Sequence, residues 1–232
     1  KLALELAGNA PDIILDDVDI EHVAKTAATT KFRNCGQVCI SPQRFYVHEK
    51  IFEEFSALVA NYAAALTVGN GLDSETRLGP LINKTQQQHV LQIIEQAKEE
   101  KNNIITGGTA QHPGNFVLPT VIEVTNKQSE FIHKEIFGPV MPLIPFSTIE
   151  EVITLANQTP YGLSAYIWTN NINHAIYLSE ALEFGMVGIN EWAPHATEAP
   201  FGGWKQSGIG HESGSEGMME YMEKKLIAIG GL

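Results

Sequence analysis

Apolar residues recur along the chain at two spacings, one typical of helices and one typical of strands. Helical spacing occurs at 20–30, 50–66, 84–101, 149–157 and 172–183. Strand-like apolar runs lie at 45–47, 103–108, 116–124, 139–146, 163–169 and 185–190. Because these runs alternate with helices of ordinary length, the pattern predicts an α/β fold with a largely parallel sheet.

The two ends of the chain also carry apolar patterns. "KLALELAG" at 1–8 predicts a strand, and since no Met precedes it, we expect the beginning of the protein to lie elsewhere. At the other end, "EGMMEYME" at 216–223 predicts a last helix and "KKLIAIGG" at 224–231 a last strand. That strand has few neighbours left in the sequence, so we expect it to pair outside its own domain as an oligomer-forming arm.

The charge of the chain excludes some functions. Among 232 residues, 15 are basic and 27 acidic, so the formal net charge is −12. A general binder of nucleic acid or of anionic membranes needs a basic face, so neither is an expected partner, although a local cationic pocket is compatible with this charge. Two cysteines are too few for a disulfide framework, which favours a cytoplasmic location. The apolar stretch 56–68 is interrupted by Asn61 and is too short to span a bilayer.

Both cysteines lie in one stretch, "FRNCGQVCIS" at 32–41. Cys39 follows Gly36 on a turn between a predicted helix and a predicted strand, where backbone N–H groups can hold an oxyanion. A thiol nucleophile fits there, but a buried, inert cysteine is the commoner state of this residue type. A local disulfide between Cys35 and Cys39 also stays open. A metal site is disfavoured because no second Cys or His pair matches the spacing.

Six motifs run in order from the first residues to nearly the last. They are "LELAGNAP" (4–11), "FRNCGQVCISPQRFYV" (32–47), "KEIFGPV" (134–140), "TPYGLSAYIWT" (159–169), "GMVGIN" (185–190) and "APFGGWKQSGIGHE" (199–212). In this order they resemble the signatures of the aldehyde dehydrogenase superfamily. Six motifs in the same order are far more specific than one. Because they extend from position 4 to position 212, the resemblance covers nearly the whole chain.

The resemblance implies a three-layer α/β/α catalytic domain with a mostly parallel sheet, plus a C-terminal oligomerisation strand. Chains of this family are considerably longer, and the sequence is similar to their C-terminal half, with the N-terminal NAD(P)-binding half largely absent. We therefore expect 1–8 to be the end of the dinucleotide-binding domain carrying the general base, 9–210 the catalytic thiol domain, and 211–232 the C-terminal helix and oligomerisation strand. A homo-oligomer, dimer or tetramer, is expected for the full-length parent.

Carried over residue by residue, the resemblance makes Cys39 the nucleophile and leaves Cys35 at a variable position of the motif. Glu5 would be the general base, although Ala7 stands where the family usually has a glycine. Glu212 resembles an acid that relays protons to Glu5. The implied reaction begins with attack of the Cys39 thiolate on an aldehyde, which gives a thiohemiacetal that expels hydride to NAD or NADP. Water activated by Glu5 then hydrolyses the resulting thioester.

The other matches concern the cofactor and the substrate tunnel. Glu135 resembles the residue that holds the nicotinamide ribose, and Phe137 the one that packs near the nicotinamide. Phe201 resembles a wall of the aldehyde tunnel, and Asn190 a structural asparagine near the floor of the active site. Taken singly, Glu135 also fits a helix-end charge, Phe137 a core aromatic and Glu212 a solvated acid. As a collinear set they favour the functional interpretation. The choice between NAD and NADP stays open.

Arg33 suggests the class of aldehyde. It lies six residues before Cys39, where many family members that act on apolar aldehydes carry an aromatic residue. A guanidinium pairs with a carboxylate in bidentate fashion. "KFRN" at 31–34 is similar to the succinate-semialdehyde dehydrogenase branch, so we expect a semialdehyde with a distal carboxylate. That branch has a serine pair before "PFGG"; here His195 or Thr197 could replace it, or the chain length could differ, as in glutarate semialdehyde. A structural salt bridge of Arg33 is the alternative.

Three hypotheses for function follow. The first is oxidation of a carboxylate-bearing aldehyde with NAD(P) by the full-length parent. The second is an isolated fragment that is inactive as a dehydrogenase and has at most thiol-dependent esterase activity, since acyl transfer to Cys39 needs no nicotinamide. The third is a fragment that only self-associates through its last strand. A CoA-acylating relative is disfavoured because Glu5 would supply a base that hydrolysis needs.

Overall fold

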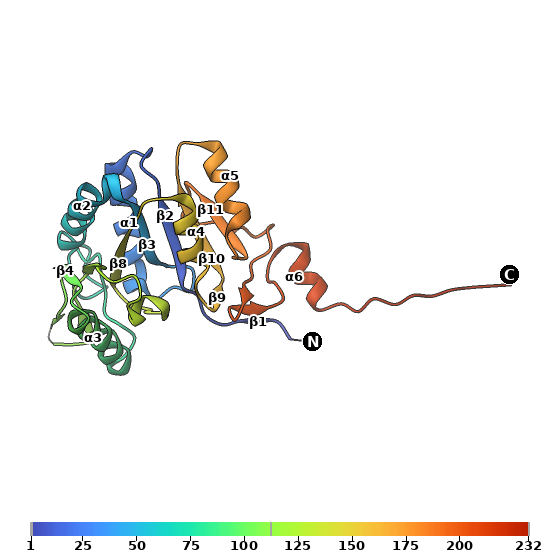
Figure 1. Cartoon of the computed structure of the whole chain (residues 1–232). Coiled ribbons are helices and arrows are strands. Elements are labelled where there is room, and N and C mark those ends of the chain that lie inside the picture. The colour runs from blue at the N-terminus through green and yellow to red at the C-terminus, as the bar shows by residue number, and fades with distance from the viewer. Residues whose placement is uncertain (1, 112, 232) are drawn as a thin grey trace.

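A seven-stranded sheet runs through the middle of the molecule (Figure 1). The computed structural model describes residues 2–111 and 113–231. The sheet consists of β2 (Ala10–Ile14), β3 (Pro42–His48), β4 (Asn103–Thr106), β7 (Thr120–Glu123), β8 (Val140–Phe146), β10 (Ser164–Trp168) and β11 (Met186–Ile189). Its strand order is β11-β10-β2-β3-β8-β7-β4, and only the β4–β7 pair is antiparallel. The prediction of a largely parallel sheet is confirmed.

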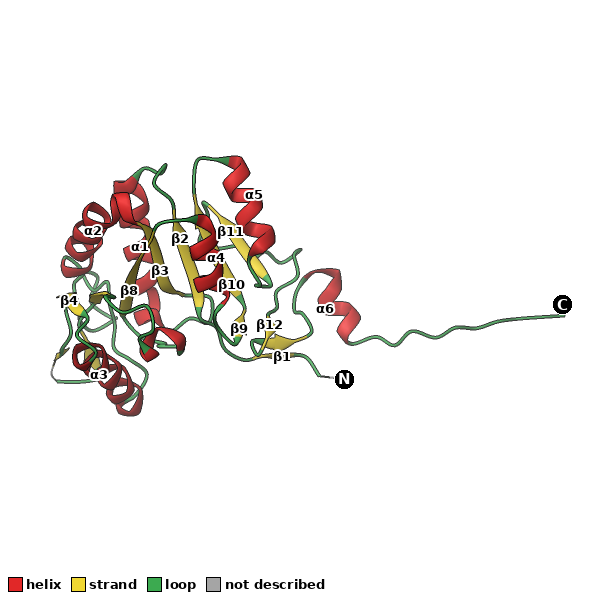
Figure 2. Cartoon of the chain, in the orientation of Figure 1, coloured by secondary structure: helices red, strands yellow, loops and turns green. Residues whose placement is uncertain are grey.

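Helices cover both faces of this sheet (Figure 2). α1 (Ile20–Phe32) and α2 (Phe52–Ala64) pack together on one face, and α4 (Ile149–Asn157) and α5 (Ile172–Ala181) pack together on the other. The chain crosses the sheet in opposite directions through these two pairs of helices, and right-handed crossovers therefore place the pairs on opposite faces. The three-layer α/β/α architecture is confirmed.

Further elements lie around the three layers. They are α3 (Lys84–Glu99) beside β4, α6 (Gly214–Glu220), and the 3₁₀ helices Arg33–Gly36, Glu49–Ile51 and Glu130–His133. Three antiparallel pairs of short strands join loops: β1 (Leu4–Glu5) with β13 (Gly208–Ile209), β9 (Tyr161–Gly162) with β12 (Trp204–Lys205), and β5 (Ala110–Gln111) with β6 (Phe116–Val117). No helix in the described ranges is long and apolar enough to cross a membrane.

The largest difference from the sequence prediction lies at the start of the chain. Of the strand expected over 1–8, only Leu4–Glu5 is a strand in the structure. The central strand β2 comes next in the chain and was not predicted. β2 is buried along its whole length, but it contains Pro11 and Asp12, two residue types that strands disfavour. The ladder between β2 and β3 shifts register between Ala10 and Pro11, which accommodates the missing N–H of the proline.

The predicted C-terminal strand does not form within the described part of the single chain. α6 forms as expected, but residues 224–231 run as an exposed, extended segment away from the body (Figure 1). The apolar pattern there correctly identifies strand-forming residues. A strand is nevertheless defined by hydrogen bonds to a neighbour, and no other described strand lies beside this segment. Pairing with a second copy stays a prediction.

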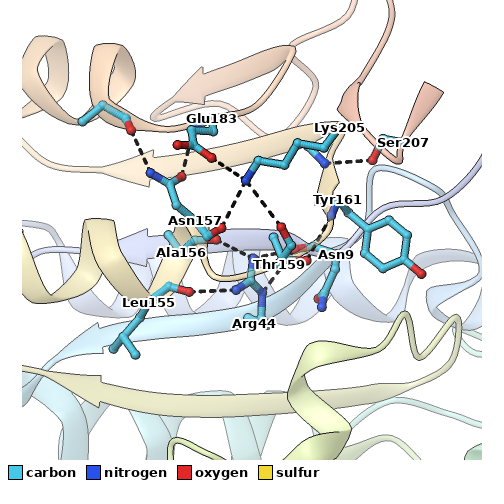
Figure 3. A network of polar contacts seen from close by, with 12 residues as sticks. Asn9, Arg44, Leu155, Ala156, Asn157, Thr159, Tyr161, Glu183, Lys205 and Ser207 are labelled. Carbon is cyan, nitrogen blue, oxygen red and sulfur yellow. Dashed lines mark hydrogen bonds and ion pairs between the residues drawn. The ribbon is translucent and has the colours of Figure 1, made fainter. Parts of the chain in front are cut away.

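Hydrogen bonds of the buried Arg44 side chain link the residue before β2 to the end of α4 (Figure 3). The Arg44 guanidinium is fully buried on β3 and donates hydrogen bonds to the carbonyl oxygens of Asn9, Leu155 and Ala156 at 2.9–3.2 Å. The last carbonyls of a helix lack partners within it and carry partial negative charge, so they suit a cation. These hydrogen bonds fix Asn9, which directly follows the segment 1–8 that carries Glu5.

Candidate active site

Cys39 lies in the connection between α1 and β3, at the amino edge of the sheet. After α1 the chain turns sharply, with Asn34, Cys35 and Gly36 all at positive φ. A Cβ on Gly36 would lie 2.1 Å from the Gly138 carbonyl oxygen, so only glycine fits this close approach. The turn buries Cys35 and leaves Cys39 partly accessible. Cys39 is therefore the more accessible of the two thiols.

Glu5 faces the Cys39 thiol. β1 carries Glu5 and pairs it with Gly208 on β13. Burial, and after it the charge and hydrogen bonding of the Glu5 carboxylate, together raise the pKa of the Cys39 thiol to about 11. A thiol with this pKa is neutral at pH 7 and needs a base to become a nucleophile. Glu5 is a carboxylate close enough to the thiol to affect its pKa.

Gly8 brings the Glu5 segment against the thiol loop. A Cβ on Gly8 would lie 2.4 Å from the Cys39 carbonyl oxygen, so the two backbones are in direct contact. The Gly8 N–H donates to Glu135 Oε1 at 3.0 Å. Burial raises the pKa of Glu135, while the Gly8 N–H opposes that rise. Glu135 is thus partly buried, tied to the backbone near Glu5, and close enough to Glu5 for their charges to interact.

A wide hollow opens beside the Cys39 loop. It has a volume of about 490 Å³ and is lined by Asn34, Gln37, Pro80, Leu81, Ile82 and Phe137. Phe137 adopts a positive φ of 49° on the loop that also carries Glu135. A partly buried carboxylate and an aromatic ring next to an open hollow are the groups that a ribose with an attached planar ring can contact. The residues present therefore fit the nicotinamide end of NAD(P).

A second, smaller cavity brings together two of the predicted substrate residues. Its lining residues are Thr30, Arg33, Val38, Ile40, Ser41, Trp192 and His195. Val38 and Ile40 flank Cys39 in sequence, so this cavity lies on another side of the same loop. Arg33 and His195 are far apart in the sequence and meet here. A guanidinium, an imidazole and two hydroxyl groups make this cavity suited to an anionic group.

Phe201 and Glu212 lie in a third, narrow cavity together with Glu5. Their backbones form an antiparallel bridge, in which the Phe201 N–H donates to Glu212 O at 2.8 Å and the Glu212 N–H donates to Phe201 O at 2.7 Å. The predicted closeness of Glu212 to Glu5 agrees with this geometry. Phe201, in contrast, lines the cavity of the two acids and not the cavity of Arg33.

Asn190 does not lie near the floor of this site. It follows β11 at the carboxyl edge of the sheet, whereas Cys39 precedes β3 at the amino edge. Its side chain accepts from the Thr169 N–H at 3.1 Å and donates to Thr169 O at 2.9 Å. A positive φ of 52° lets it turn back onto β10. Its role is structural, as predicted, but its place was predicted wrongly.

Several residues around the site were missed by the sequence analysis. The Tyr166 hydroxyl donates to the carbonyl oxygen of Ile40 at 2.5 Å and so holds the peptide between Ile40 and Ser41. Lys31 is completely buried behind the site. Tyr166 belongs to an apolar strand pattern and Lys31 ends an ordinary helix, so neither had a distinguishing signal. No group of three or more His, Cys, Asp or Glu in the described residues could hold a metal ion.

Comparison with known proteins agrees with this geometry. The model of the aldehyde dehydrogenase family matches residues 1–227. The chain belongs to the aldehyde dehydrogenase family. The resemblance drawn from the six motifs is confirmed.

Individual members of the aldehyde dehydrogenase family match over the same region. The mitochondrial succinate-semialdehyde dehydrogenase of Oryza sativa subsp. japonica is 45% identical over 100% of this chain and 44% of its own length. The 3-sulfolactaldehyde dehydrogenase of Pseudomonas putida is 40% identical over 100% of this chain and 48% of its own length. An NAD+ complex of the Bacillus cereus aldehyde dehydrogenase superposes with a TM-score of 0.93 at 40% identity, covering 96% of this chain and 46% of that one. The chain thus spans about half the length of the relatives it matches.

Proposed function

We propose that the protein oxidises an aldehyde to the corresponding acid with NAD(P), using Cys39 as the nucleophile and Glu5 as the base. The observation that carries the proposal is the direct contact between the segment of Glu5 and the Cys39 loop, where a Cβ on Gly8 would lie 2.4 Å from the Cys39 carbonyl oxygen. NAD(P), when bound, supplies the acceptor for the hydride. Both NAD and NADP stay open, since one relative carries NADP(+) in its name and one similar structure is an NAD+ complex.

Glu5 would act twice in this reaction. It first takes the proton from the Cys39 thiol, so that the thiolate adds to the aldehyde carbon and forms a thiohemiacetal on the protein. The Cys39 backbone N–H is a candidate donor to the resulting oxyanion. After the hydride leaves, a thioester joins the acyl group to Cys39. Glu212, which lines the same narrow cavity as Glu5, would take each proton from Glu5 in turn, so that Glu5 is ionised again when it deprotonates the attacking water.

We also propose that the aldehyde carries a distal carboxylate. The support is the cavity that Arg33 shares with His195, together with the names of several relatives, which include succinate-semialdehyde dehydrogenases. An Arg33 side chain in this cavity would bind the carboxylate, and His195 would take the place of a hydroxyl donor. Substrate length would be set by the distance from Arg33 to the Cys39 sulfur.

Steady-state kinetics with matched aldehydes test both proposals. Succinate semialdehyde and butanal, each with NAD+ or NADP+, differ by the terminal carboxylate. Cys39→Ala should abolish oxidation of both, while Cys35→Ala should retain it. Arg33→Met should raise KM for succinate semialdehyde about 10- to 100-fold and leave KM for butanal unchanged, because a charged hydrogen bond is lost only with the former. Equal effects on both aldehydes would contradict the carboxylate assignment.

The esterase hypothesis has specific support as a partial reaction of the same site. Cys39 and Glu5 both belong to this chain, and neither acylation by an activated ester nor hydrolysis of the thioester needs a nicotinamide. Mass spectrometry after brief treatment with an activated ester should find the acyl group on Cys39. Glu5→Gln should make that acyl-enzyme accumulate, because its hydrolysis loses the base. Equal labelling of Cys35 and Cys39 would contradict the assignment of the nucleophile.

A further inference from the structure

The cavity that holds Arg33 has an aromatic wall, Trp192, to which the reaction described above assigns no role. Trp192 follows β11 and lines this cavity together with Arg33 and His195. The cavity has a volume of about 30 Å³. A cavity needs roughly 10–15 Å³ to hold one water molecule, so this one takes a group of only a few non-hydrogen atoms. A carboxylate is a group of this size.

Two buried aromatic side chains of β10 hold the Trp192 ring in place. The rings of Tyr166 and Trp168 have their centroids 5.3 Å and 4.7 Å from that of Trp192, at interplanar angles of 44° and 40°. Tyr166 and Trp168 are two residues apart on one strand and therefore face the same side of the sheet. Aromatic pairs at these separations attract each other. The Trp192 ring thus rests on a rigid aromatic base.

Tyr166 also connects this aromatic wall to the loop of the nucleophile. Its hydroxyl donates to the Ile40 carbonyl oxygen at 2.5 Å, while its ring contacts Trp192. Ile40 follows Cys39 in the sequence and lines the same cavity. One buried side chain therefore fixes the wall next to Cys39 and supports the wall formed by Trp192. The cavity should keep its size because both walls depend on the same residue.

The turn after β11 brings Trp192 back over β10. Asn190, at a positive φ of 52°, pairs its side chain with the backbone of Thr169, and Trp192 comes two residues later. The Trp192 indole N–H is shielded from solvent and has no hydrogen-bond partner among the described residues. A buried indole N–H usually finds a partner, and leaving it without one costs free energy. Hydrogen bonding therefore does not account for a tryptophan at this position, whereas the size of its ring affects the cavity directly.

We propose that Trp192 is a specificity-determining residue for the length of the aldehyde. Its ring limits the cavity in which Arg33 would bind the distal carboxylate. A chain as long as succinate semialdehyde fits between Cys39 and this cavity, and a chain one methylene longer does not. The inference deepens the proposed function, on which it rests for Cys39 as the nucleophile and for Arg33 as the partner of the carboxylate.

Acylation of Cys39 by two activated esters that differ by one methylene tests the proposal without a nicotinamide. The esters are the 4-nitrophenyl monoesters of succinate and glutarate. Mass spectrometry measures the rate at which each modifies Cys39, and each rate is divided by the rate of the same ester with free cysteine. In the wild-type protein the succinyl group should be transferred about tenfold faster or more, which is the usual effect of one methylene in a closed pocket. Trp192→Ala opens the cavity and should reduce this ratio about tenfold.

Two further variants separate a change in the size of the cavity from a loss of structure. Trp192→Phe keeps an aromatic ring on Tyr166 and Trp168 and gives up no hydrogen bond, so it should fold. Its ratio should lie between those of the wild-type protein and Trp192→Ala. Tyr177→Ala removes a half-exposed aromatic side chain from α5, which contributes nothing to this cavity, and should leave the ratio unchanged. A general loss of structure would lower both rates together and leave their ratio as it was.

The ratio of the two rates decides the proposal. A wild-type protein that accepts both acyl groups equally, or a ratio that stays the same in Trp192→Ala, would overturn it while leaving Cys39 as the nucleophile. If Trp192→Ala does not fold, Trp192→Phe decides, and an unchanged ratio there overturns the proposal. Failure of the proposed function differs visibly, since neither ester would then modify Cys39 in any variant, and the inference would fall with it.

Discussion

Asp12 and Asp16 lie four residues apart, and their surroundings shift the pKa values of their carboxyl groups in opposite directions. Asp12 is fully buried on β2, and neither of its oxygens makes a well-formed hydrogen bond. Burial raises the pKa of Asp12 well above its ordinary value, and the indole of Trp168 offsets this only in part. Asp16 is near the surface, where its ion pair with Lys50 at 2.7 Å lowers its pKa. The same side chain thus opposes folding in one place and supports it in the other.

The pH dependence of stability should show this difference. A raised pKa in the folded state means that the contribution of Asp12 is present below its ordinary pKa and is lost as the pH rises through the folded value. Asp12→Asn should therefore raise Tm at pH 8 and have little effect near pH 3. Asp16→Asn should lower Tm slightly at pH 8, and the effect should vanish as the pH falls through the lowered pKa of Asp16. Thermal unfolding followed by circular dichroism measures both, and a lower Tm for Asp12→Asn at pH 8 would contradict the first.

At the same scale, sequence motifs point to the proposed reacting groups but not to the residues that surround them. Cys39 and Glu5 stand in motifs that name them directly. Lys31 and Tyr166 gain their importance from burial and from contacts across elements. A lysine at the end of a helix looks like any surface residue until its side chain proves to be enclosed. Such a residue cannot be identified from the local pattern, because its environment comes from segments far along the chain.

Among the elements, the short ladder between β1 and β13 decides where Glu5 lies. Leu4 pairs with Ile209, and Glu5 pairs with Gly208. The Leu6 N–H extends the contact by donating to Ser207 O at 2.9 Å. A Cβ on Gly208 would lie 2.2 Å from the Leu4 carbonyl oxygen. The two strands can therefore approach this closely only because position 208 has no side chain.

Gly208→Ala should displace Glu5 without touching Cys39. We expect both acylation of Cys39 by an activated ester and hydrolysis of the acyl-enzyme to slow about tenfold, because Glu5 is the proposed base for the thiol in the first step and for water in the second. Rapid-mixing kinetics separate the initial burst from the slower turnover. Gly79→Ala is the matched control, since a Cβ there would meet nothing within 4 Å. Unchanged rates of both steps would mean that the ladder does not fix the position of Glu5.

The elements also show where pattern reasoning succeeds. The helix predicted over 149–157 has the same limits in the structure, because a Thr148 cap and an amphipathic repeat mark it locally. β2 escaped prediction because Pro11 and Asp12 interrupt its apolar run, although its neighbours β3 and β10 enclose it on both sides. Tertiary enclosure thus overrode the local preference of two residues.

For the whole molecule, the C-terminal segment 224–231 is the part whose apolar side chains find no cover within the single chain. Leu226 is 93% exposed, and Ile227 and Ile229 are also largely exposed. Exposed apolar residues in an extended segment are suited to pairing with a sheet edge of another chain. Homo-oligomerisation through this segment therefore stays our expectation.

Charge placed in this segment should weaken self-association. Leu226→Asp combined with Ile227→Asp should reduce the molar mass measured by light scattering to that of the monomer at low micromolar concentration. Association would bury these two apolar side chains, and carboxylates in their place would have to be buried instead. Leu72→Asp is the control, since Leu72 is equally exposed on a distant loop. An unchanged mass in the double variant would show that association, if present, uses another surface.

The neutral resting state of Cys39 has a consequence for how long the protein lasts. Peroxides attack the thiolate and leave the thiol almost untouched. With a pKa of about 11, only on the order of one Cys39 in ten thousand is ionised at pH 7. The proposed nucleophile should therefore survive oxidative stress that inactivates proteins with permanently ionised cysteines. Burial, and after it the Glu5 carboxylate, would thus protect this thiol from oxidation while no substrate is bound.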